Sequence, residues 1–135
     1  MKKIGFLFIV FLSINSFSQN LTCKDFKEGT FFVPSDSETL VSYKIIRNGN
    51  SQVEIVTDPE FEQTIYVIIE WIDDCSYRSF YDTEKMTLND YQKFINENGG
   101  ILTELKEIKG KCFFFKSTLS ANDDIQVING KFCSE

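Results

Sequence analysis

The chain has 135 residues, a formal net charge of −6 at pH 7 and no histidine. Its acidic balance argues against nucleic-acid binding, which usually needs a basic patch. Without histidine, the chain cannot build a Ser-His-Asp or Cys-His catalytic set, and it lacks a common metal ligand. The composition therefore excludes several kinds of enzyme, and the length suits one domain.

The first 18 residues have the pattern of a signal peptide. Residues 2–3 are lysines, residues 4–12 are apolar, and residues 16–18 (Ser-Phe-Ser) fit the small-x-small pattern before a cleavage site. The apolar run is shorter than the ~20 residues of a membrane-spanning helix. We expect cleavage after residue 18, which leaves a single secreted or periplasmic β-rich domain at 19–135. Loss of the two lysines changes its net charge from −6 to −8.

Four cysteines remain in that domain: Cys23, Cys75, Cys112 and Cys133. An even number in an exported domain predicts two disulfides, for which three connectivities are possible. A zinc site would normally show Cys-x-x-Cys pairs or histidines, and the sequence has neither. We therefore expect disulfides and no metal ligands.

Residues 40–58 (LVSYKIIRNGNSQVEIVTD) predict a β-hairpin, because β-branched and aromatic residues flank Asn48-Gly49-Asn50. A two-residue Asn-Gly turn would place Ile45 opposite Gln52, whereas a three-residue loop would place it opposite Val53. We favour the three-residue loop because it gives the hairpin one apolar face.

Residues 64–82 (TIYVIIEWIDDCSYRSFYD) predict a strand that is long for one element. Its odd positions from Ile65 to Trp71 are more apolar than its even positions and should face the core. A bulge or bend at Asp73-Asp74 would turn both acids outward. The two acids could instead bind calcium or act as an acid–base pair, but neighbours on a strand point to opposite faces. We therefore predict solvated acids.

Residues 87–98 (TLNDYQKFINEN) predict the one helix, which Gly99-Gly100 would end. Thr87 would cap it, with Asp90 at the third position of a capping-box variant. Four residues would share its buried face: Leu88, Tyr91, Phe94 and Ile95.

The remaining residues predict further strands. Residues 101–120 suggest a hairpin that turns near Lys109-Gly110, although residues 101–108 also fit the spacing of a helix. A turn at 122–124 (Asn-Asp-Asp) leads to a last strand at 124–133. The whole is an antiparallel sheet that carries one helix.

Three residues are candidate contacts for a ligand or partner. Arg47 shares the apolar face of the 40–58 hairpin but lies at its end. There it could extend to solvent, hold an anionic ligand or reach Glu54. Trp71 is the only tryptophan and is expected to pack in the core. No catalytic residue and no cofactor are predicted.

Three linked motifs lie in the first part of the chain: Cys-x-x-Phe-Lys-x-Gly-x-Phe at 23–31, Arg47 with Gln-x-Glu at 52–54, and Trp-x-x-Asp-Cys-x-Tyr at 71–77. Together they resemble a family of small uncharacterised secreted proteins of Gram-negative bacteria. Some members carry a DNA topoisomerase IV label, which a short, acidic and exported chain does not support.

The resemblance couples the motif of Cys23 to that of Cys75, and we therefore expect the pairs Cys23–Cys75 and Cys112–Cys133. The first bridge would close a loop of about 50 residues and anchor the start of the mature chain. In the second, Cys112 begins a strand and Cys133 ends one, as antiparallel neighbours could.

Gly29-x-Phe31 is similar to the Gly-x-Trp start of lipocalins, in which the aromatic residue plugs one end of a small barrel. The expected fold is therefore mainly β (α+β). It is either a curved antiparallel meander sheet or a small lipocalin-like barrel, with one helix near residues 87–98.

The leading function hypothesis is a non-enzymatic exported domain that binds a small apolar or amphipathic ligand inside the curved sheet. Its motivation is the aromatic load, since ten of the 14 phenylalanines follow residue 18. The alternative is an acidic protein-binding module, such as an inhibitor or immunity-type factor, because a net charge of −8 would steer a basic protein toward it. Neither hypothesis includes nucleic acid, or a membrane once the signal is cleaved.

Overall fold

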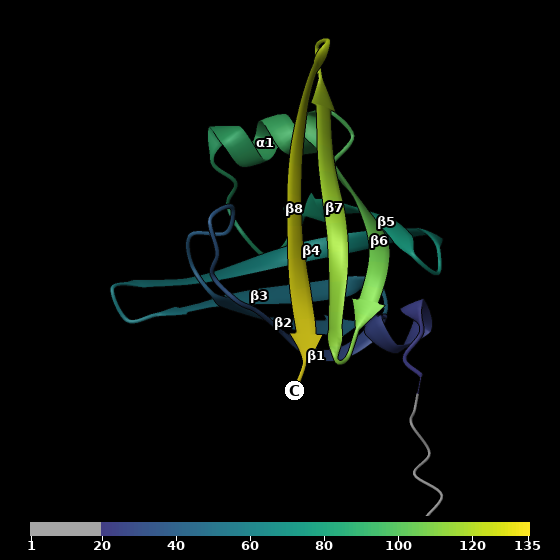
Figure 1. The fold of residues 1–135 in the computed structure, drawn as a ribbon. Coiled ribbons are helices and arrows are strands. Elements are labelled where there is room, and N and C mark those ends of the chain that lie inside the picture. The colour runs from purple at the N-terminus through teal and green to yellow at the C-terminus, as the bar shows by residue number, and fades with distance from the viewer. Residues whose placement is uncertain (1–19) are drawn as a thin grey trace, which may run out of the picture.

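Eight antiparallel strands form one closed barrel in the computed structural model, which describes residues 20–135 (Figure 1). Each strand pairs with the next one along the chain, and β1 pairs with β8 to close the sheet. The strands are β1 (Glu28–Val33), β2 (Tyr43–Asn48), β3 (Ser51–Asp58), β4 (Phe61–Asp73), β5 (Ser76–Tyr81), β6 (Ile101–Lys109), β7 (Cys112–Ala121) and β8 (Asp124–Ser134). A 3₁₀ helix, η1 (Cys23–Phe26), precedes them, and the helix α1 (Asp90–Glu97) lies between β5 and β6. The expected mainly β meander is confirmed in its barrel form.

The β2–β3 hairpin is confirmed, but neither of the two registers that we considered is correct. The turn is Gly49-Asn50, so that Ile45 lies opposite Glu54 and Arg47 opposite Gln52. Gly49 has a φ of 60°, a left-handed conformation that glycine adopts without strain. The expectation of one apolar face was wrong because β3 places two polar residues, Gln52 and Glu54, inside the barrel.

The long segment 64–82 belongs to two strands rather than to one bent strand. β4 ends at Asp73, the chain reverses at Asp74-Cys75, and β5 begins at Ser76. A register shift between Trp71 and Asp73 marks a bulge just before this turn. The Asp73 Oδ1 atom accepts a hydrogen bond of 2.8 Å from the backbone N–H of Cys75, which fixes the turn locally. Both acids are exposed, as expected.

The predicted helix is present as α1, but it begins later than expected. Asn89 caps it instead of Thr87. The Asn89 side chain accepts a hydrogen bond from the backbone N–H of Gln92, and the Gln92 side chain accepts one from the backbone N–H of Asn89. The expected buried face is correct for Leu88 and Ile95 and wrong for Tyr91, which is exposed, and Gln92 is buried as well.

The C-terminal hairpins follow the expected pattern. Residues 101–109 form β6, so their helical alternative is wrong, and the chain turns between Lys109 and Cys112. Asn122 and Asp123 connect β7 to β8 with φ values of 48° and 65°, the left-handed conformation of a type I′ hairpin turn.

Both expected disulfides are present. Cys23 of η1 is bonded to Cys75 of the β4–β5 turn, and Cys112 to Cys133, its direct partner in the β7–β8 ladder. Two disulfides with no free cysteine in residues 20–135 indicate an oxidising compartment. In the same residues, no helix is long and apolar enough to cross a membrane. The expected signal peptide at 1–18 lies outside the described residues.

Candidate ligand-binding site

One end of the barrel is closed by aromatic packing around η1. Phe26, which ends η1, is 1% exposed, and its ring meets the Phe113 ring edge-on with 4.5 Å between centroids. Phe31 of β1 and Phe132 of β8 each lie 5.4 Å from the Phe26 ring, centroid to centroid. Phe31, the aromatic residue of the Gly29-x-Phe31 motif, and Phe26 together plug this end of the barrel.

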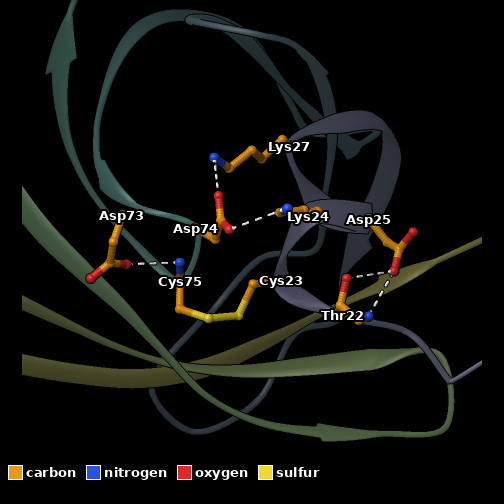
Figure 2. Close-up of a disulfide and its surroundings, with 8 residues drawn as sticks. All are labelled: Thr22, Cys23, Lys24, Asp25, Lys27, Asp73, Asp74 and Cys75. Atoms are coloured by element: carbon orange, nitrogen blue, oxygen red, sulfur yellow. Dashed lines mark hydrogen bonds and ion pairs between the residues drawn. A yellow bond between two sulfur atoms is a disulfide. The ribbon is translucent and has the colours of Figure 1, made fainter.

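The β4–β5 turn holds η1 against this end (Figure 2). Besides the Cys23–Cys75 disulfide, the Asp74 Oδ1 atom accepts a hydrogen bond of 2.7 Å from Lys27 Nζ. Lys27 lowers the pKa of Asp74 below its usual range through this bond and through its charge. The two neighbouring acids therefore have separate structural partners and do not share a site, because Asp73 holds the turn and Asp74 holds η1.

Arg47 of β2 organises the closed end from within. It is 2% exposed, and all three of its guanidinium nitrogens donate hydrogen bonds. Nε donates to Gln52 Oε1 at 2.8 Å, Nη1 to the backbone carbonyl of Phe26 at 2.7 Å, and Nη2 to the hydroxyl of Tyr77 at 3.0 Å. Arg47 thus ties η1 to β3 and β5, so that the plug and the barrel wall form one packed unit.

The expectation that Arg47 extends to solvent is wrong. In a closed barrel, the inward face of β2 has no edge from which a side chain could reach water. Four aromatic rings instead surround the guanidinium, with the ring centroids of Tyr77 and Trp71 at 4.9 and 5.6 Å from its carbon. The expected link to Glu54 exists, but it is indirect. Gln52 accepts from Arg47, and its Nε2 donates to Glu54 Oε1 at 2.7 Å.

Trp71 supports the same end, as its expected role in the core requires. Its indole Nε1–H donates to the backbone carbonyl of Gly49 at 3.1 Å, and its ring meets Tyr77 edge-on at 5.0 Å. Lys27 Nζ lies over the indole ring, 4.8 Å from its centroid. Trp71 does not line the interior cavity that is described next, and it packs against Tyr77 at the closed end.

Above this closed end, the barrel encloses a cavity of about 220 Å³. Three lining residues belong to the closed end and form the floor: Gln52, Tyr77 and Phe132. Tyr91 of α1, which is 57% exposed, lines the cavity together with exposed residues of β8. These exposed lining residues place the mouth of the cavity beside α1. Figure 1 shows that α1 and η1 lie at different ends of the barrel.

Glu54 is the one charged residue among the lining residues of this cavity. Burial raises the pKa of its carboxyl above the usual range, although the Gln52 hydrogen bond and the Arg47 charge act in the opposite direction. Burial, and then the charge of Glu54, also raise the pKa of Tyr43 and bring that of Tyr81 to about 12. Both phenols therefore stay neutral at physiological pH and can donate hydrogen bonds into the cavity.

The three predicted contact residues therefore divide between two places. Glu54 lines the cavity, whereas Arg47 and Trp71 lie at its closed end and hold the floor. Sequence reasoning missed Tyr43 and Tyr81 as lining residues. Their signal was present, since each stands at an inward position of its strand, two or four residues from a buried one.

Comparison with known protein families, with curated proteins and with solved structures finds no match for this chain. Among residues 20–135, no three acidic or cysteine side chains gather as they would around a metal ion. The arrangement itself offers a closed floor, one carboxylate, several hydroxyls and an aromatic wall. These groups can bind and orient a small molecule.

Proposed function

We propose that this protein is a non-enzymatic binding protein that holds one small amphipathic molecule inside its barrel. One observation carries the proposal: the barrel has a packed floor at one end and a mixed polar and aromatic cavity that opens at the other. Small-molecule sites are typically concave and mostly apolar, with a few placed polar groups.

The volume of the cavity limits the size of the ligand that can bind. A cavity of about 150 Å³ is known to hold benzene, whereas drug-sized ligands usually occupy ~300 Å³ or more. At about 220 Å³, this cavity suits a molecule on the order of ten non-hydrogen atoms. Apolar lining residues such as Val67 and Leu119 would contact its hydrocarbon part, and hydroxyls such as those of Thr103 and Ser117 its polar part.

We further propose that the protein works in the periplasm or outside the cell after removal of residues 1–18. The signal-like start of the sequence and the two disulfides support this location. The motif resemblance to small secreted proteins of Gram-negative bacteria agrees with it.

Native mass spectrometry of protein purified from its own host tests the binding function. Leu119→Trp adds bulk to an inward position of β7, whereas Val127→Trp adds a tryptophan to an exposed outward position of β8 and is the matched control. We expect one small-molecule adduct on the wild type and on Val127→Trp, and none on Leu119→Trp. Ser117→Leu, a smaller filler, replaces Leu119→Trp if that variant does not fold. An adduct that survives in the folded filler, or a wild type that never carries one, overturns the proposal.

A further inference from the structure

The polar groups of the cavity have one unusual feature, which is a carboxyl group without a direct cationic partner. Glu54 is the one charged lining residue, and within residues 20–135 it takes part in no ion pair. The Arg47 guanidinium carries a positive charge that acts on Glu54. Its three nitrogens already donate hydrogen bonds to Gln52, Phe26 and Tyr77. Arg47 is therefore connected to the carboxylate by hydrogen bonds only through the Gln52 amide.

The Glu54 carboxylate also retains unused hydrogen-bonding capacity. In the described part of the chain, its one hydrogen bond is the 2.7 Å contact from Gln52 Nε2 to Oε1. Its second oxygen has no protein donor, and no side-chain oxygen or nitrogen that is fully buried in residues 20–135 lacks a partner. The second oxygen therefore remains accessible from the cavity, where a ligand can donate to it.

Aromatic rings surround the same space. Tyr43 and Tyr81 lie close enough to Glu54 for its charge to affect their hydroxyls, and Phe80, Tyr91 and Phe115 complete the aromatic lining. The faces of aromatic rings attract organic cations, most strongly where water is displaced. No lysine or arginine lines the cavity itself, and Arg47 lies below its floor with all three guanidinium nitrogens bonded to protein acceptors.

From these observations we infer that the ligand is a small organic amine, whose protonated nitrogen binds the free oxygen of Glu54 while its hydrocarbon part fills the aromatic cavity. This inference rests on the proposed binding function and adds the chemical class of the ligand. A bound ammonium would supply the opposite charge that the carboxylate lacks, and a charge-assisted hydrogen bond is stronger than one between neutral groups.

Three probes that share one phenylethyl skeleton isolate the role of the charged group. Phenethylamine is protonated at pH 7, since alkyl amines titrate near pH 10. 2-Phenylethanol is neutral and phenylacetate is negative, and all three match the size that the cavity suggests. Isothermal titration calorimetry with the disulfide-bonded mature protein gives the Kd of each. Glu54→Gln is the matched variant, because the amide keeps the shape of the side chain and can still accept from Gln52.

We expect phenethylamine to bind the wild type at least about tenfold more tightly than 2-phenylethanol, and phenylacetate to bind most weakly. In Glu54→Gln the amine should lose this advantage while 2-phenylethanol keeps its Kd. Equal or tighter binding of the alcohol or the acid to the wild type overturns the amine assignment and leaves the binding function intact. An amine preference that persists in Glu54→Gln overturns it as well. Failure of all three probes to bind counts against both the ligand class and the cavity's function.

Discussion

Replacing Arg47 with methionine should destabilise the barrel severely, because it removes the group that joins η1 to two strands. Methionine keeps much of the length of the side chain but donates no hydrogen bonds. The change leaves three acceptors without their donor: Gln52 Oε1, the Phe26 carbonyl and the Tyr77 hydroxyl. Hydrogen bonds to a charged group contribute about 1.5–3 kcal/mol each, but loss of the buried charge also removes its desolvation cost. We therefore expect a net loss of about 3–5 kcal/mol, because each buried acceptor left without a donor costs about 1–3 kcal/mol.

Urea unfolding of the oxidised protein measures this loss, and calorimetry should show a fall in Tm of about 4 °C for each kcal/mol. The other arginine is the matched control. Arg78 is half-buried and donates one bond of 3.2 Å to the Gly99 carbonyl. Arg78→Met should cost about 1 kcal/mol or less. If Arg47→Met costs no more than Arg78→Met, the network is not what holds the closed end, and the reasoning fails.

Three further changes have distinct expected outcomes. Glu54→Gln should raise Tm at pH 7 and have little effect below a pH of about 4. The Glu54 carboxyl binds its proton more tightly in the folded protein than in the unfolded one, so its ionisation costs stability as the pH rises through the raised pKa. An equal change in Tm at both pH values would contradict this. Cys23→Ser with Cys75→Ser should cost about 4 kcal/mol in urea unfolding, from a sequence separation of 52 residues, and a loss below about 1 kcal/mol would be inconsistent with an anchored plug. Asp73→Asn with Asp74→Asn should leave ligand affinity unchanged in calorimetry, whereas a large loss of affinity would restore a binding role for these acids.

The parts of the fold that could be predicted from the sequence are those that neighbouring residues determine. The strands, their turns and the helix follow from alternation, glycine positions and caps, which neighbouring residues determine. The register of the β2–β3 hairpin could not be obtained in the same way. Its inward positions include Gln52 and Glu54, and a rule that maximises one apolar face rejects that arrangement.

The position of Arg47 depended on non-local structure. From the sequence, an arginine at the end of a hairpin has solvent nearby. Only closure of the barrel and the return of η1 across its end bring Phe26 and Tyr77 to the guanidinium, from 21 and 30 residues away in the chain. The acids of the 70–80 segment show the reverse case. Their exposure was predictable from strand geometry, but the partnership of Asp74 with Lys27 was not, because it depends on η1.

The central claim, that the open half of the barrel is a binding cavity, is tested most directly by a ¹⁵N-HSQC titration with 2-phenylethanol. This probe is uncharged, so the result does not depend on the role of Glu54 in recognising an amine. We expect saturable shift changes at amides of residues that line the cavity, such as Tyr43, Thr103 and Ser117, and none at outward residues such as Ile46 and Val127. Shifts confined to the outward residues, or no saturable shift at any amide, would contradict the account.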